Sequence, residues 1–104
     1  MDSAVLRCPD TVQAMVSQAK PTVTVLYNEP THDQAGHPMT ALSKTTIYYD
    51  IGNGRIGAKE VPSTGPSGGG QISETITVPI PHDRGVVQAN ICVTATDQQG
   101  NESR

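Results

Sequence analysis

The stretch that decides the fold is Ala89-Asn-Ile-Cys-Val-Thr-Ala-Thr-Asp-Gln-Gln-Gly-Asn-Glu-Ser-Arg104. Its apolar residues recur at every second position, which is the period of a β-strand; they are Ala89, Ile91, Val93 and Ala95. The residues between them are mostly polar, so one face of the strand is expected to meet a core and the other to meet solvent or a partner. Gly100 then centres a turn and a polar exit. The stretch predicts a β-protein.

Length and composition extend this prediction to the whole chain. With 104 residues, the chain is near the usual size of one domain, so residues 1–104 are expected to form a single domain with 1–8 as an extended leader. Val, Ile and Thr together make 29 residues, whereas Leu occurs three times, and β-branched side chains favour strands. Three Tyr with no Phe or Trp predict a thin core, because aromatic rings bury the most area. The domain is either a modest monomer or one that leans on neighbours for stability.

Charge and hydropathy narrow the classes of partner. Ten acidic residues against seven basic ones, without a basic cluster, argue against nucleic acid as a partner, because neutralising phosphates needs clustered Lys and Arg. The longest apolar runs are a few residues, so no membrane span is predicted. The first residues have neither the basic nor the apolar region of a signal peptide. A location outside the cell would therefore need another export route or a longer parent chain.

The two cysteines, Cys8 and Cys92, are far apart in the sequence. Geometry decides between a disulfide and two thiols, and both alternatives stay open. With no second pair of cysteines and no adjacent His, a zinc site is not expected.

Strands follow one another along the chain, separated by Gly and Pro turns. Residues 3–19 fit either a weak helix or a first edge strand, and we favour the strand. Alternation of apolar residues predicts further strands at 22–27, 45–51, 55–61, 72–80 and 86–97. Pro79 marks a strand end or an edge. The connecting loops are expected at 31–40, 62–71 and 81–85, and the Gly- and Ser-rich loop 62–71 is predicted to be flexible with little to pack.

About seven short strands without helical periods predict an all-β, antiparallel two-sheet sandwich. Three of the segments also resemble the fibronectin type III domain, in particular its bacterial and phage versions. Val23-x-Val25-x-Tyr27-x-x-Pro30 is similar to the family's second strand, Leu42 with Thr45-Thr-Ile-Tyr-Tyr49 to its third, and Ile91 to Ser103 to its sixth strand and exit. The resemblance covers roughly residues 9 to 104.

The resemblance implies an Ig-like sandwich, and the departures from the family pattern concern large core residues. Tyr27 stands where Trp is usual, Thr45 where Tyr is usual, and Ala89 where the sixth strand normally has a core Tyr. The seventh strand looks truncated. Strand addition by a neighbouring chain is one way to complete it.

No constellation of catalytic residues is recognisable. No serine lies in a Gly-x-Ser-x-Gly elbow, and Gly68-Gly-Gly70 lacks the Lys-Ser/Thr of a phosphate loop. His32, Asp33 and His37 share one loop and have the chemistry of metal ligands, but Gly36 and Pro38 oppose the helix that such spacing would need. We therefore expect no catalytic, cofactor or metal site.

Contact residues are predicted on an exposed strand face and in the loops. If Tyr48 alternates outward from Ile47 and Tyr49, it is a candidate contact residue, because Tyr offers contact area at little entropic cost. The alternative, equally open, is that Tyr48 packs in the core, since Tyr48 and Tyr49 cannot both point inward. His32, His37 and Arg84 lie in predicted loops, which in sandwiches cluster at the ends of the fold.

Together these features favour a non-catalytic structural and protein-interaction module within a larger assembly, such as a phage virion or tail. The alternative is a spacer or accessory domain from an exported multidomain bacterial protein that handles polysaccharide or adhesion. A small metal-dependent binder or enzyme using the histidines is the third reading. Protein partners are expected, through self-association or flanking subunits and domains; a carbohydrate partner stays open but no residue pattern supports it. A virion or extracellular location is favoured.

Overall fold

The computed structural model describes residues 11–32, 36–52 and 54–102, and within these ranges the chain is all-β with no helix. Six strands are present there: β1 (Val12–Ser17), β2 (Thr22–Asn28), β3 (Leu42–Asp50), β4 (Ile56–Pro62), β5 (Gln71–Thr77) and β6 (Val86–Asp97). The strand interpretation of the N-terminal segment is confirmed for 12–17. The predicted leader, residues 1–8, lies outside the described residues.

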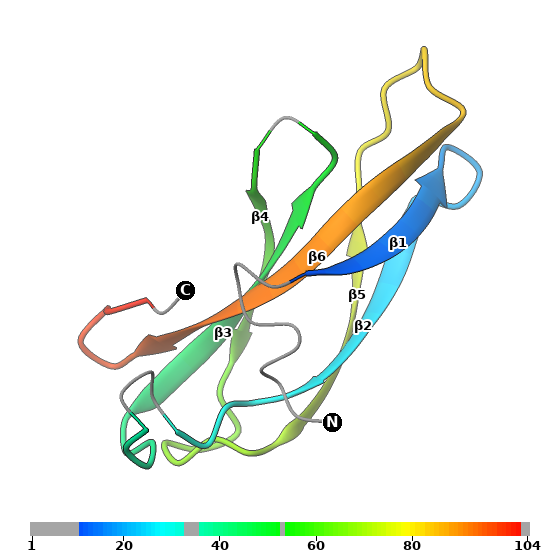
Figure 1. Ribbon diagram of the computed structural model, residues 1–104. Coiled ribbons are helices and arrows are strands. Elements are labelled where there is room, and N and C mark those ends of the chain that lie inside the picture. The colour runs from blue at the N-terminus through cyan, green and yellow to red at the C-terminus, as the bar shows by residue number, and fades with distance from the viewer. Residues whose placement is uncertain (1–10, 33–35, 53, 103–104) are drawn as a thin grey trace.

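The strands form two antiparallel sheets (Figure 1). One has four strands in the order β1-β6-β3-β4, and the other pairs β2 with β5. β6 is twelve residues long and lies between β1 and β3. Its first half pairs with β1, from Val12 opposite Ile91 to Ser17 opposite Val86, and β3 pairs with it from Asn90 to Asp97.

The core lies between the sheets, which is consistent with a sandwich. Alternation places one side chain in two inward on each strand, and the buried apolar set draws on every strand: Val16, Val25, Tyr27, Ile47, Tyr49, Val61, Ile72, Ile76, Val78, Val87, Ala89, Ile91 and Val93. Aliphatic side chains of moderate size dominate this set, as the composition predicted. Tyr49 points inward and Tyr48 outward, as alternation from Ile47 predicts.

The outer face of β6 differs from its prediction. Its polar-side residues Cys92, Thr94 and Thr96 are 2%, 1% and 7% exposed, whereas the alternating pattern placed this face toward solvent or a partner. The chain itself covers part of it: Glu102 forms an isolated antiparallel bridge with Thr96, and its carboxylate contacts Thr94. The expected seventh strand is thus reduced, in the described residues, to this single bridge.

The Gly- and Ser-rich loop between β4 and β5 also contradicts its prediction, because it has extensive contacts. The main-chain N–H of Leu42 donates to the carbonyl of Pro66 at 2.9 Å, and the N–H of Gly68 donates to that of Gly65 at 3.1 Å. At Gly68, where φ is +70°, an added Cβ would overlap the carbonyl oxygen of Pro30. The missing side chains therefore permit close packing, which the composition did not reveal.

The molecule is an elongated rod of 45 × 24 × 21 Å. Figure 1 shows the β1–β2 and β5–β6 connections together at one end, and the β2–β3 and β4–β5 connections together at the other. These four connections follow the sandwich rule that loops gather at the two ends of the fold.

Candidate interaction surfaces

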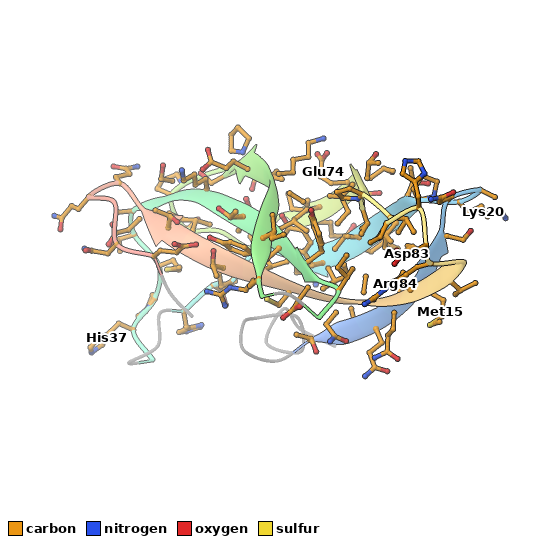
Figure 2. All side chains as sticks on the ribbon, turned by 90° about the horizontal axis from the view of Figure 1, so that it is seen from above. Met15, Lys20, His37, Glu74, Asp83 and Arg84 are labelled. Atoms are coloured by element: carbon orange, nitrogen blue, oxygen red, sulfur yellow. The ribbon has the colours of Figure 1, made fainter. Side chains whose placement is uncertain are left out.

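The four predicted contact residues lie in three separate places. Tyr48 is half-buried on the outer face of the four-stranded sheet. His32 and His37 lie at the end formed by the β2–β3 and β4–β5 connections, and Arg84 lies at the opposite end, in the β5–β6 connection. Figure 2 shows His37 and Arg84 far apart along the rod. No single surface therefore combines these residues.

Tyr48 is held by contacts within the chain. Its hydroxyl donates to Glu102 Oε2 at 2.5 Å, and the same oxygen accepts the Thr94 hydroxyl at 2.6 Å. The guanidinium carbon of Arg55 lies 4.7 Å from the centroid of the Tyr48 ring, a cation–π contact. This outer cluster, Tyr48, Arg55, Thr94 and Glu102, fixes the end of the described chain against the sheet.

The hydrogen bonds shift the titration of the outer cluster in opposite directions. The Thr94 hydroxyl and then the Tyr48 hydroxyl stabilise the Glu102 carboxylate and lower its pKa. The same bond to Glu102, with burial, raises the pKa of Tyr48. A hydrogen bond donated to a carboxylate stabilises its charged form, which lowers the pKa of Glu102. The same bond stabilises the protonated form of the donor, which raises the pKa of the Tyr48 hydroxyl.

A turn upstream presents Glu102 to Tyr48. The Asp97 carboxylate accepts the main-chain N–H groups of Gln99 and Asn101, each at 2.9 Å. These bonds, that of Asn101 foremost, lower the pKa of Asp97. Gly100 lies in the turn with φ of +91°, as the sequence around it predicted.

The loop with the two histidines is short and closed by the chain itself. His32 forms an isolated bridge with Pro38, and its Nδ1 lies 2.9 Å from the Thr31 hydroxyl. The hypothetical third ligand, Asp33, lies outside the described residues. In the part of the chain that the structure describes, no three His, Cys, Asp or Glu side chains gather as a metal site would require.

The opposite end is held by contacts between its two connections. Gln18 Nε2 donates to the carbonyl of Pro81 at 3.2 Å and lies 3.4 Å from His82 Nδ1. The N–H of Arg84 closes the turn on Pro81 at 3.1 Å. Figure 2 shows Lys20, Asp83 and Arg84 together at this end, with Met15 near them.

Glu29, which the sequence interpretation did not single out, organises the end that contains the histidines. Its side chain is 1% exposed. It accepts three hydrogen bonds: from the N–H of Thr64 at 2.8 Å, the Thr64 hydroxyl at 2.5 Å and the N–H of Gly70 at 3.0 Å. A buried carboxylate needs such donors, and here they fasten the β4–β5 loop to the end of β2. The sequence signal that could have identified Glu29 is a charged residue placed between a strand and Pro30.

A shallow pocket of about 220 Å³ opens beside the outer face of β6. Thr11, Asp50, Arg55, Asn90 and Cys92 line it. Asp50 Oδ1 already accepts the N–H groups of Gly52 and Gly54, at 2.7 and 3.3 Å, and so supports the β3–β4 turn. Cys92 is disulfide-bonded, and the chain's other cysteine, Cys8, lies outside the described residues.

The edges of the sheets differ in how they are protected. β4 carries Lys59 and Glu60, ends at Pro62, and has a register shift against β3; charges, proline and irregular pairing all discourage strand addition. β1 has the sequence Val-Gln-Ala-Met-Val-Ser, with no charge or proline, and pairs with β6 without a shift. Met15, at 65% exposure, is among the most exposed apolar side chains described.

Comparison with protein-family models, with curated proteins and with solved structures finds no match for this chain. A search of the described residues for a helix of the length and apolar character needed to span a membrane finds none.

Proposed function

We propose that the chain is a non-catalytic structural and protein-interaction module that works within a larger assembly, such as a phage virion or tail. The observation that carries the proposal is the uncharged, regular edge strand β1 on a rod-shaped, two-sheet domain whose loop ends are tied down. An open edge recruits protein partners by strand addition. Hydrogen bonds within the loops at both ends of the domain suit a structural module that holds the subunits on either side of it at a fixed distance.

The resemblance to the fibronectin type III domain supports this proposal. In Ig-like sandwiches the second strand pairs with the fifth, and the third with the sixth; here β2 pairs with β5 and β3 with β6. One departure is that β1 lies beside β6 and not beside β2. We propose a fibronectin type III-like sandwich in which the first strand takes an edge of the larger sheet.

A location in a virion or outside the cell agrees with the disulfide at Cys92, because stable disulfides persist in oxidising surroundings and at virion surfaces. The alternative function, a spacer or accessory domain of an exported multidomain bacterial protein, draws on the same disulfide and the same rod shape. The two differ in what flanks the chain and not in its fold.

The test begins with the genes beside the one that encodes this chain. Co-expression with the neighbouring products, followed by size-exclusion chromatography, is expected to yield a defined complex with a capsid or tail subunit. A catalytic domain in the same reading frame would favour the spacer. Heat of metal binding in the parent that is abolished in His32→Ala and His37→Ala would overturn both and favour the metal-dependent binder or enzyme.

A further inference from the structure

We propose that the β1 edge pairs with the β1 edge of a second copy of this chain, antiparallel and across a two-fold axis, so that two four-stranded sheets become one continuous sheet. This inference rests on the proposed function, a protein-interaction module, and identifies a second copy of the chain as one protein that it binds. The outer edge of β1 has no neighbouring strand among the described residues, since β6 lies on its other side. Figure 1 shows β1 along the margin of the larger sheet.

The sequence of β1 is compatible with itself. Opposite residues of an antiparallel pair lie on the same face, so an in-phase dimer joins the inward set Val12, Ala14 and Val16 with its own copy and the outward Gln13 and Met15 with theirs. No charged residue lies in Val12–Ser17, so no like charges meet anywhere along the ladder. A two-fold interface requires this self-complementarity.

Exposure along β1 indicates what the second copy would cover. Val12 belongs to the inward set, opposite Ile91, yet is 38% exposed. Met15 projects from the outer face at 65% exposure. In an in-phase dimer Met15 lies directly opposite or diagonal to its counterpart, within about 8 Å. The in-phase register pairs at most five residues of each β1 strand, which is a small interface, so the dimer is expected to be weak and concentration-dependent.

The other edges fit this role less well. β4 is protected by charge and Pro62, and β5 is tied to β4 by the ion pair of Lys59 Nζ with Glu74 Oε1 at 2.5 Å. β2 is uncharged as well, but it belongs to the two-stranded sheet. Its exposed Leu26, at 67%, supplies a matched control on that sheet.

The test is sedimentation velocity of the full chain over a range of concentrations. The parent is expected to dimerise, and Met15→Lys is expected to weaken the dimer at least about tenfold through like-charge repulsion across the axis. Mixing Met15→Lys with Met15→Glu should restore a dimer. Leu26→Lys, an equally exposed apolar-to-charged change, should leave the dissociation constant unchanged. Circular dichroism checks that each variant is folded.

Three outcomes would overturn the inference. A parent that stays monomeric up to about 1 mM, the limit of weak association, excludes the dimer. Dissociation by Leu26→Lys with no effect of Met15→Lys would place the contact on the other sheet. A dimer whose dissociation constant is changed by neither Met15→Lys nor Leu26→Lys would place the contact elsewhere on the molecule. None of these results affects the proposed function, whose test concerns neighbouring gene products and metal binding.

Discussion

The phenol oxygen of Tyr27 lies 2.6 Å from the Thr45 hydroxyl, and this buried hydrogen bond joins the two sheets. Tyr27 comes from β2 and Thr45 from β3, and they are 7% and 0% exposed. In the fibronectin type III-like sandwich that we propose, larger residues, Trp and Tyr, are usual at these two positions. Tyr27 and Thr45 each bring a hydroxyl into the apolar core, where a polar group needs a hydrogen-bond partner. Each hydroxyl is the partner of the other.

We therefore expect coupling between the two residues in a double-mutant cycle. Tyr27→Phe leaves the Thr45 hydroxyl unpaired, and Thr45→Val leaves the Tyr27 hydroxyl unpaired, so each should lower the free energy of unfolding by about 1–3 kcal/mol. The double variant should cost less than the sum, by about 1 kcal/mol. Urea denaturation measures all four proteins. Strict additivity would mean that the bond contributes nothing.

The β4–β5 loop gives a matched pair of glycine substitutions. Gly68→Ala should lower stability by more than about 2 kcal/mol, because its φ of +70° is strained for alanine and the new Cβ would overlap the Pro30 carbonyl. Gly65→Ala meets nothing within 4 Å and should stay within about 0.5 kcal/mol of the parent. Thermal unfolding of both is the measurement, and equal melting temperatures would show that the loop is not packed as described.

Glu29 offers a second test of the same end. Glu29→Gln replaces one accepting oxygen with an NH₂ donor. This donor would face an N–H or hydroxyl group of Thr64 or Gly70, which loses its acceptor, so the free energy of unfolding should fall by about 1–3 kcal/mol. Glu60→Gln is the control: Glu60 pairs with Lys44 at 2.8 Å but is 66% exposed, and such surface pairs contribute about 0–1 kcal/mol. Equal losses in the two variants would contradict the role assigned to Glu29.

How much the sequence predicted depends on the range of the interactions. Alternation is local, so β2, β3 and β6 and the inward side of Ile47 and Tyr49 were predictable. The tie between Glu29 and Gly70 spans 41 positions, and nothing in the composition of the Gly-rich loop indicated it. Likewise the outward register of Thr94 was clear, but its burial depends on Glu102 returning from the turn at Gly100.

The candidate surfaces divide in the same way. Alternation placed Tyr48 on the opposite face of its strand from Ile47 and Tyr49 but left open which face is buried; the structure has Tyr48 half-buried on the outward face. Its contacts with Arg55 and Glu102 depend on tertiary structure and were not predicted. The position of β1 beside β6 was equally out of reach, because an edge strand of this composition pairs as well with one sheet as with the other.

The disulfide at Cys92 should contribute measurably to stability. We expect no free thiol in the oxidised protein under denaturing conditions, and peptide mapping without reduction identifies the pairing with Cys8. A bridge of this kind typically contributes about 2–4 kcal/mol, so the melting temperature should fall on reduction. The Cys92→Ser variant should be unaffected by the reductant. Two free thiols per chain would contradict the bond.

The outer cluster predicts a change in the acid stability of the protein. Because the folded-state pKa of Glu102 lies below its ordinary value of 4.5, its contribution is present at neutral pH and is lost as the pH falls through the lowered pKa. Glu102→Gln should be less stable than the parent at pH 7, by less than about 1 kcal/mol since Glu102 itself is solvent-exposed.

This deficit should begin to shrink as the pH falls below 4.5, where the unfolded parent takes up the proton, and should be lost once the pH is below the lowered pKa of Glu102 in the folded protein. Asp97, whose pKa is also lowered, adds an acid slope that both proteins share, so the difference between them isolates Glu102. Tyr48 gives an independent readout: its raised pKa should return toward 10.0 in Glu102→Gln, followed by ultraviolet absorbance of the phenolate, with Tyr48→Phe assigning the signal. An unchanged Tyr48 titration would show that the Tyr48 hydroxyl does not donate a hydrogen bond to Glu102 in solution.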